Sequence, residues 1–342
     1  MNNQGQIVWK GWGTENKSIY LYDGTRTRKI ANNASNMYSI MINNNSQVVW
    51  VGEVGDDQEI FLYDLATGST TNISRRPKNQ DSSPSINDKG QVVWDGQANS
   101  SRDIFLYDPS NKMVTNISKS PALDISSQIN AKGHIIWNGH DNDDEYIYFY
   151  DGTTTTQIAH GNFGSPFFYN GKILWWNSYS SKQKALFLYD PSNGTTLNIS
   201  GILSINHSSP KINESGQIVW ATKDFQIYFH DFSNNTTSNI SNNDSQNLNP
   251  QSNAAGQVVW SRHKDRNAVV FLYEGGTTHQ LTDSAEQNYV PLINNNGQIV
   301  WVERKGSDFD IILYDGGKKT RVLPAGTRPA RLPRSKHVIS WD

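Results

Sequence analysis

The chain alternates short apolar runs with polar turns, and the same succession of runs returns about eight times. In the clearest copy, a short extended run, Pro84–Asn87, ends in Asp88-Lys-Gly90, a tight turn in which glycine supplies a positive φ angle. Gln91–Trp94 and Asp103–Asp108 follow, apolar on both alternations, as strands covered on both faces are. Val114–Ser118 is more polar, which predicts a strand at an outer edge.

A tryptophan at the end of the second run sets the register of the copies. These residues are Trp9, Trp50, Trp94, Trp137, Trp175, Trp220, Trp260, Trp301 and, in a degenerate last copy, Trp341, at intervals of 41, 44, 43, 38, 45, 40, 41 and 40 residues. This spacing suits a unit of four short strands, and radial arrays of such units form propellers. No helical period persists. We therefore predict an all-β, eight-bladed β-propeller of four-stranded antiparallel blades; seven blades plus a spare repeat is the alternative.

The repeat array predicts a single propeller domain over residues 1–342, with about eight repeats. Met1 falls in mid-repeat, just before a second strand, so the first blade is expected to lack its innermost strand at the N-terminus, and the sequence leaves open whether a leader or an earlier strand was trimmed away. The run Arg328–Pro333 can supply that strand, so the ring would be closed by strands from both termini. A further run, Val338–Trp341, competes with Gln6–Trp9 for a place in the closing blade.

Charge and cysteine content narrow the function classes. Thirty basic and 32 acidic residues give a formal charge of -2, so the whole molecule has no strong nucleic-acid signal. The absence of cysteine excludes a disulfide framework, a thiolate metal site and a cysteine nucleophile. No apolar run approaches the roughly 18 residues of a membrane span, and the N-terminus carries no signal peptide, so a soluble protein is expected.

The run Pro84–Trp94, with Ile104–Asp108 behind it, resembles the WD-repeat-like propeller repeats of the TolB type over nearly the whole chain, and Leu281-Thr282 keeps the family ending. Two departures stand out: Ile-Asn replaces the Trp-Ser of the first strand, and tryptophan moves to the end of the second. The resemblance implies a rigid platform for partners and, together with the lack of cysteine, favours a periplasmic or extracellular location. It carries over no catalytic residue.

One candidate ligand site lies in the loops that lead into the first strand of each copy. In propellers these loops, and those between second and third strands, usually open on one face near the central channel. Three residues before the start of that strand stands an Asp or Asn, namely Asn36, Asp81, Asp124, Asn247 and Asn288. A ring of such side chains could bind a cation or a polyhydroxyl ligand. The alternative is that each caps its own turn.

A possible calcium site and a possible sugar site have weaker signals. Asp141, Asp143 and Glu145 place oxygen ligands at alternating positions, which could suit Ca²⁺, but the run lacks the glycine and glutamate of an EF-hand loop. A solvated loop is the alternative. Trp12 and Trp176 lie outside the tryptophan ladder and are therefore the better candidates for stacking on a glycan.

The C-terminal region is basic and could meet an anionic partner, although such a run is more often a solvated rim. Its members are Lys318, Lys319, Arg321, Arg328, Arg331, Arg334 and Lys336. The eight histidines form no motif at catalytic spacing. We therefore expect a non-catalytic binding or scaffold propeller that recognises a protein partner or a surface glycan through its loop face. The alternative is a hydrolase or lyase with a channel-facing Asp/His site, possibly metal-dependent.

Overall fold

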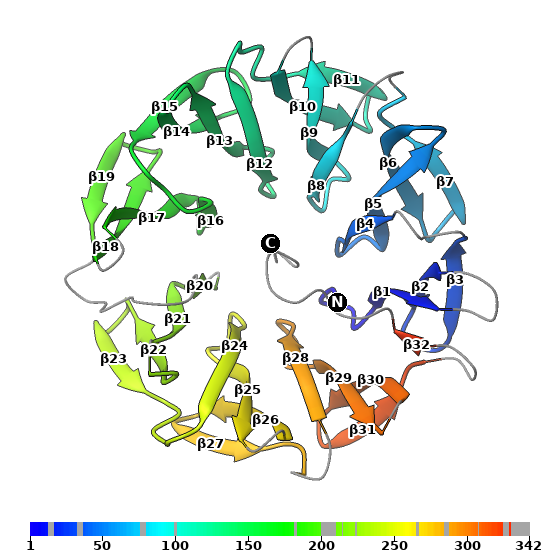
Figure 1. Cartoon of the computed structure of the whole chain (residues 1–342), viewed down its shortest axis with the longest axis vertical. Coiled ribbons are helices and arrows are strands. Elements are labelled where there is room, and N and C mark those ends of the chain that lie inside the picture. The colour runs from blue at the N-terminus through cyan, green and yellow to red at the C-terminus, as the bar shows by residue number, and fades with distance from the viewer. Residues whose placement is uncertain are drawn as a thin grey trace.

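The computed structural model describes residues 1–12, 17–32, 37–75, 80–98, 101–180, 183–199, 210–213, 215–222, 224–264, 267–283, 287–306, 308–323 and 328–329. Within these ranges the regular elements are all strands, which confirms the predicted all-β fold. No helix in them is long and apolar enough to cross a membrane. The strands form eight successive groups of four, here called blades 1 to 8, arranged as the ring of a propeller (Figure 1). The last two groups are joined into one eight-stranded sheet by a single parallel pair between Ala268 and Gln287.

The strand bounds follow the repeat. Blade 1 contains β1 (Ile7–Trp12), β2 (Lys17–Tyr22), β3 (Thr27–Ala31) and β32 (Arg328–Pro329), and blade 2 contains β4 (Tyr38–Ile42), β5 (Gln47–Val54), β6 (Asp57–Asp64) and β7 (Ser69–Asn72). Blade 3 contains β8 (Ser82–Ile86), β9 (Val92–Ala98), β10 (Ser101–Asp108) and β11 (Met113–Asn116), and blade 4 contains β12 (Leu123–Ile129), β13 (Ile135–Asp141), β14 (Asp144–Tyr150) and β15 (Thr155–His160).

The second half of the ring repeats the plan. Blade 5 contains β16 (Phe167–Tyr169), β17 (Lys172–Ser180), β18 (Gln183–Asp190) and β19 (Thr195–Asn198), and blade 6 contains β20 (Lys211–Ile212), β21 (Gln217–Ala221), β22 (Ile227–Asp231) and β23 (Thr236–Asn239). Blade 7 contains β24 (Gln246–Ser252), β25 (Val258–Lys264), β26 (Asn267–Glu274) and β27 (Thr277–Gln280), and blade 8 contains β28 (Gln287–Ile293), β29 (Ile299–Lys305), β30 (Asp308–Asp315) and β31 (Lys318–Arg321).

Neighbouring strands of each blade pair antiparallel in chain order, from an inner first strand to an outer fourth strand. The outer strands are the polar ones: the side chains of β7, β19 and β27 are almost all exposed. Blade 1 departs from chain order, because β32 takes the inner position and pairs with the end of β1 through Gly11 and Pro329. The run proposed to compete for this position, Val338–Trp341, lies outside the described residues.

The tryptophan ladder forms the core between blades, as the sequence predicts. Trp50, Trp94 and their equivalents as far as Trp301 are buried. In most blades the tryptophan stacks on an aromatic ring of the third strand of the same blade. Trp50, for example, stacks on Phe61 with ring centroids 5.8 Å apart. Trp94 also packs in one cluster with Ile60 of the preceding blade. Each tryptophan removes a large aromatic area from water at a blade boundary, which stabilises the ring.

A belt of asparagines links the blades at the turns between first and second strands. Asn87 uses its side-chain Oδ1 to accept from the backbone N–H groups of Lys89 and Gln91, at 3.0 and 3.1 Å, which closes its own turn. Its Nδ2 donates to the backbone carbonyl of Asn130 in the next blade at 2.9 Å. The same bond to the next blade is made by Asn2, Asn43, Asn213, Asn253 and Asn294.

The glycine of this turn is favoured by its backbone conformation and lies in close contact with the preceding blade. Gly90 has a φ angle of 75°, which favours glycine, and a Cβ there would lie 2.8 Å from Oε1 of Gln47 in the preceding blade. Gln47 in turn accepts from Nδ2 of Asn43 at 2.9 Å, so the glutamine of one blade fills the space left by the glycine of the next. The recurring Asn-x-x-Gly-Gln run is therefore a contact between blades as well as a turn.

The belt also joins the two ends of the strand array. Nδ2 of Asn294 in blade 8 donates to the backbone carbonyl of Asn2 at 2.9 Å, across 292 positions of sequence. Blade 5 departs from the pattern, because its turn is the two-residue hairpin Asn170-Gly171, with φ angles of 41° and 75°. In place of the glutamine, Lys172 binds Asp190 at 2.6 Å.

We expect Asn294→Ala to destabilise the protein by about 2–4 kcal/mol, because it leaves buried backbone donors and the carbonyl of Asn2 without their partner. Asn193→Ala is the matched control, since Asn193 makes only exposed bonds to Thr195 in the turn between the outer strands of blade 5. The control should cost under about 1 kcal/mol. Urea denaturation of both variants checks this, and equal losses would show that the belt does not stabilise the ring.

Candidate functional site on the loop face

Antiparallel pairing sorts the connections of the blades onto two faces. The turns between first and second strands and between third and fourth strands lie on one side, here the turn face. The loops between second and third strands, and those that lead to the next blade, lie on the other side, here the loop face. The turn face carries the asparagine belt, whose polar groups are bonded within the protein. The loop face is the better place to look for a ligand.

The Asp and Asn residues proposed to surround the channel are buried at the start of the first strands. Asp81, Asp124, Asn247 and Asn288 are each 0% exposed, while Asn36 lies outside the described residues. Asn247 shows what the position does: its Oδ1 accepts from the indole Nε1 of Trp260 at 3.0 Å. This placement favours the structural alternative over a ring that a channel ligand could reach.

The same position ties a blade to the one before it. Nδ2 of Asn247 donates to the carbonyl of Phe225 at 2.8 Å, and Nδ2 of Asn288 donates to the carbonyl of Ala268 at 3.1 Å. Both carbonyls belong to the preceding blade. The spacing of thirteen residues to the ladder tryptophan is shared by Asp81, Asp124, Asn247 and Asn288, whereas Asn36 stands fourteen before Trp50.

Three carboxylates of blades 3 and 4, those of Asp95, Asp103 and Asp124, lie near enough to interact electrostatically, and the repeat pattern singled out only Asp124 among them. Asp95 accepts from the backbone N–H groups of Ser126 and Ser127 in the next blade, at 3.1 and 3.2 Å. Burial nevertheless raises the pKa of Asp95 to about 6. Burial likewise raises the pKa of Asp124 to about 6, and the neighbouring charges of Asp103 and Asp95 act in the same direction.

A signal for this group was present in the sequence. Asp95 follows the ladder residue Trp94 directly, at a position where the neighbouring copies have Val51 and Asn138. An acidic residue next to a buried tryptophan therefore breaks the repeat, and a comparison of the copies position by position would have found it.

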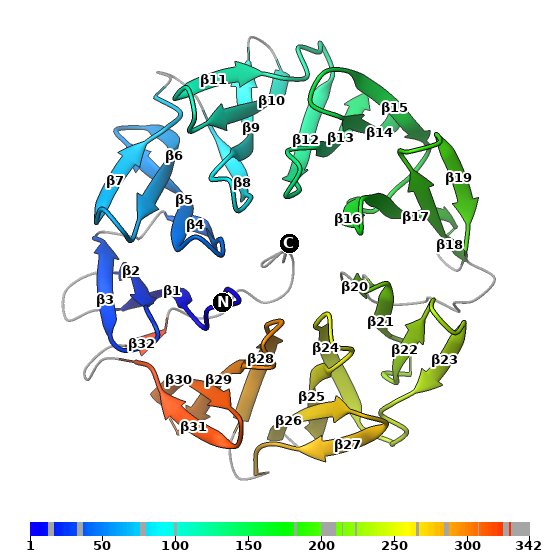
Figure 2. The ribbon, with the colours of Figure 1, turned by 180° about the vertical axis from the view of Figure 1, so that it is seen from behind.

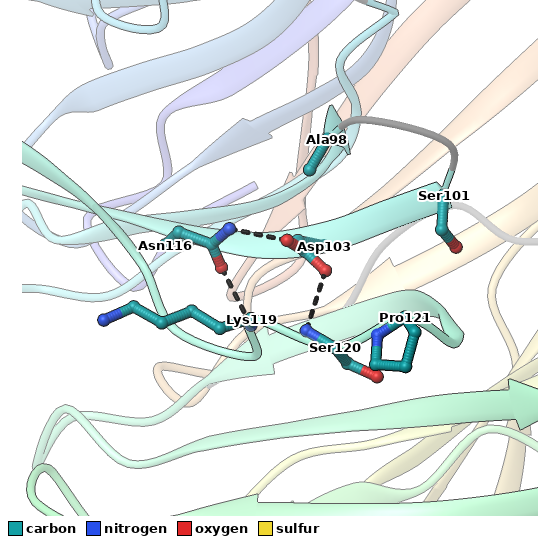
Figure 3. Close-up of a pocket in the computed structure, with 7 residues that line it drawn as sticks. All are labelled: Ala98, Ser101, Asp103, Asn116, Lys119, Ser120 and Pro121. Carbon is teal, nitrogen blue, oxygen red and sulfur yellow. Dashed lines mark hydrogen bonds between the residues drawn. The ribbon is translucent and has the colours of Figure 1, made fainter.

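A polar hollow of about 470 Å³ lies beside this carboxylate group on the loop face. It is lined by Ala98, Ser101, Asp103, Asn116, Lys119, Ser120 and Pro121 (Figure 3). Two hydrogen bonds fix the carboxylate of Asp103, which accepts from Nδ2 of Asn116 at 2.5 Å and from the backbone N–H of Ser120 at 3.3 Å. The hollow therefore presents fixed polar groups and the ammonium group of Lys119.

The proposed calcium ligands lie on the hairpin between β13 and β14. Glu145 accepts from the backbone N–H of Phe163 at 3.0 Å, and Asp141 accepts from Nδ2 of Asn142 at 3.0 Å. Asp143 is exposed at the turn. Among the residues with described positions, no three carboxylate or histidine groups come together in a way that could hold a metal ion.

The two tryptophans proposed to bind a glycan have different outcomes. Trp176 is half-buried and packs against the cluster of Leu174 and Trp220. A Cβ on Gly164 would lie 2.0 Å from the Trp176 ring, so the Gly164 backbone covers part of that indole. Trp12 ends β1, and its side chain lies outside the described residues.

Only the first part of the proposed basic patch is described. Lys318, Lys319 and Arg321 lie on the outermost strand of blade 8, where Arg321 binds Asp310 at 2.6 Å. The backbone of Arg328 belongs to β32, and the other members of the proposed patch, Arg331, Arg334 and Lys336, lie outside the described residues. A docking role for the patch stays a prediction.

Most of the exposed large hydrophobic side chains in the described ranges lie on the loop face. Six such residues occur in the described ranges, and four of them, Tyr38, Val54, Leu123 and Phe225, lie at strand ends or loops on that face. The other two, Met113 and Leu197, belong to outermost strands. Sequence reasoning missed this asymmetry, because apolar residues at strand ends look the same as core positions until the ring is assembled.

No family model matches the chain, and no curated protein sequence matches it. Solved structures match its fold. The acylaminoacyl peptidase of Pyrococcus horikoshii matches with a TM-score of 0.56, 12% identity, and coverage of 84% of this chain and 52% of that one. The β-propeller domain of the Trilobed protease from Pyrococcus furiosus matches with a TM-score of 0.55, 11% identity, and coverage of 84% and 95%. An oligogalacturonate lyase in complex with manganese matches with a TM-score of 0.56, 11% identity, and coverage of 79% and 85%.

At these identities the likeness shows the fold alone, and the chain spans about half the length of the peptidase it matches. The propeller fold implied by the TolB resemblance is confirmed. Membership of the TolB-type family stays a prediction.

We expect Asp124→Asn to stabilise the protein by about 1 kcal/mol at pH 7, because blades 7 and 8 carry asparagine at the same position. The pKa of Asp124 is raised from 3.8 to about 6, so the folded state holds this proton more tightly than the unfolded state. Wild-type stability from this group is therefore present below pH 4 and lost as the pH rises through 6.

The gain from Asp124→Asn should accordingly be near zero at pH 4 and full at pH 7, as measured by urea denaturation at both values. Asp143→Asn, at an exposed turn, is the control and should change stability by less than about 0.5 kcal/mol at either pH. A loss of stability at pH 7 in Asp124→Asn would show that the charged carboxylate is needed.

Proposed function

We propose that this protein is a non-catalytic binding propeller that takes a protein partner on its loop face. The observation that carries this proposal is that four of the six exposed large apolar side chains in the described ranges, Tyr38, Val54, Leu123 and Phe225, lie on the loop face, on blades 2, 4 and 6. Exposed apolar side chains interspersed with polar groups are typical of surfaces that become buried on association. The turn face, with its internally bonded asparagine belt, offers no comparable group among the described residues.

The rigidity of the blades supports a platform role. The loop-face residues are carried on strand ends fixed by buried tryptophans and by bonds between blades, such as that from Asn288 to Ala268. A partner that docks on such a surface loses little free energy to ordering of the platform itself. A glycan stays the alternative ligand: Trp176 is partly covered by Gly164, whereas the rings of Tyr38 and Phe225 are exposed on the same face.

A photo-crosslinking amino acid placed at residue 123 or 225 should capture the same partner from an extract of the organism that makes the protein. Leu123 and Phe225 are 39% and 38% exposed, and the matched control positions Met113 and Leu197 are 60% and 61% exposed but lie on outermost strands. Capture should therefore depend on the face and not on exposure. Equal capture at the control positions, or none at residues 123 and 225, would overturn the proposal.

A hydrolase or lyase is the second candidate, favoured by the carboxylates of blades 3 and 4. Asp103 lines the hollow, and the pKa of Asp95 and of Asp124 behind it is raised to about 6 by burial, in the range of a general acid. The peptidases and the lyase of similar fold supply the substrates for a test. Turnover of a peptide or oligogalacturonate that is lost in Asp103→Asn would favour this candidate over the binding role.

A further inference from the structure

The outermost strands of six blades carry no charge, whereas those of blades 8 and 1 are basic. No lysine, arginine, aspartate or glutamate occurs in β7, β11, β15, β19, β23 or β27. Blades 8 and 1 instead hold six bases in the outermost strand or directly before it, here called the basic rim, which are Lys318, Lys319, Arg321, Arg26, Arg28 and Lys29. Half of these bases come from each end of the chain, so the sequence alone separates them.

The two basic strands lie end to end along the outer edge of the ring. Blades 8 and 1 are neighbours when the ring is seen from either side (Figure 1, Figure 2). Thr27, the first residue of β3, donates through its Oγ1 to the backbone carbonyl of Val322, directly after β31, at 2.5 Å. The end of one strand therefore meets the start of the next. At about 3.4 Å per residue, the strand positions from Lys318 to Arg321 and from Thr27 to Lys29 form a row roughly 24 Å long.

Three acids lie among the six bases, and each is bonded to another side chain. The pairs are Asp23 with Arg28, Asp310 with Arg321 and Asp315 with Gln298. The basic rim therefore keeps an excess of three positive charges. Asp308, the remaining acid of the hairpin formed by β30 and β31, begins β30 and pairs in register with Lys305, at the opposite end of that strand from Lys318.

Four of the bases are available to a ligand. Lys29, Lys318 and Lys319 are exposed, and within the described ranges none of them has an ion-pair partner. The ammonium group of Lys319 lies 5.9 Å from the centre of the Trp301 ring, a contact that leaves its charge in place. The side chain of Arg26 is 74% exposed, and its Nε is 3.9 Å from the carboxylate of Asp23, which already accepts from Arg28.

Protection of a strand edge does not account for these bases. Lysine on an edge strand prevents pairing with the edge of another sheet. That explanation would apply equally to all eight outermost strands, but six of them have no charged residue. The basic rim is therefore a departure from the repeat that two neighbouring blades share, and a binding role explains why the bases are confined to one part of the edge.

The side chains of the rim favour one class of partner. No exposed large apolar side chain occurs among the described residues of β3 and β31, whereas docked proteins are anchored by apolar and aromatic side chains, and single-stranded nucleic acid stacks on aromatic rings. A formal charge of -2 for the chain is unlike that of a protein that binds duplex nucleic acid. A single row of ammonium and guanidinium groups suits a polymer that carries anions along one chain.

We propose that the basic rim binds a linear anionic polysaccharide, whose sulfate or carboxylate groups follow the row of bases from β31 to β3. This site lies on the outer edge of the ring and is separate from the loop face, so it adds a second ligand to the proposed function. Binding should weaken with salt, because the bases are exposed.

The test is fluorescence anisotropy of labelled polymers with the purified full chain at low and high salt. Dextran sulfate and carboxymethyl dextran carry the two kinds of anion on the same sugar chain, and unmodified dextran is the uncharged control. At least one of the two anionic dextrans should bind at low salt, and unmodified dextran should not. A duplex DNA is included to separate a polysaccharide site from a nucleic-acid site.

The variant that removes the available lysines is Lys29→Gln with Lys318→Thr and Lys319→Thr. Each new residue is the one that blade 4 or blade 7 has at the same register position, so the variant is expected to fold. Its dissociation constant for the anionic dextran that binds should rise at least about tenfold at low salt, because three charges are lost from the row. Circular dichroism of both proteins checks that the fold is kept.

The matched control is Lys89→Asn with Lys112→Asn and Lys132→Asn, which removes the same charge from exposed positions of blades 3 and 4 and should bind like wild type. Four results would contradict the inference: no binding of either anionic dextran by the wild-type chain, equal binding of unmodified dextran, equal losses in the two variants, or tighter binding of the duplex. Capture of a protein at residues 123 and 225 tests the loop face alone, so either site can fail without the other.

Discussion

One interaction recurs through the structure and sets what the rest of the chain can do: the side-chain amide of an asparagine that bonds its own turn and the next blade together. The turn at the end of a blade contains buried backbone N–H and C=O groups, and leaving these groups without hydrogen-bond partners would cost free energy. Asn87 satisfies three of them with one side chain. The glutamine and glycine that accompany it fit one blade against the next, so blade spacing is fixed by polar contacts as well as by tryptophan packing.

The sequence was sufficient to predict the architecture, because the repeat appears in every copy at nearly constant length. Strand order, the polar outer strands and the buried tryptophans all follow from the composition of the successive runs and from their repeat of about 41 residues. The Asn170-Gly171 hairpin could also be predicted from the sequence, since a two-residue hairpin turn needs residues that adopt positive φ angles. The contact between Gln47 and Gly90 could not be predicted, because the motif alone does not show that its last residue contacts the next blade.

The candidate site was less predictable, for a physical reason. A search for repeats identifies the residues that the copies share, and shared residues such as Asn247 are those that stabilise the fold. Function in a repeat protein depends on what distinguishes one copy from another. The charges of Asp141 and Lys264 and the apolar side chain of Leu123 are such differences, and their common location on one face emerges only when strands far apart in sequence are set side by side.

Blade 5 gives the ring a mechanical asymmetry. Its turn lacks the Asn-x-x-Gly-Gln run, and at its boundary with blade 6 the phenol of Tyr169 occupies the space above Gly216 that a glutamine takes elsewhere. A closed ring of blades is expected to open first at the boundary between blades that has the fewest stabilising contacts. The described asparagine bonds run from blade 6 through blade 1 to blade 4, so opening of the ring should begin at the boundaries of blade 5, away from the seam where its two ends are joined.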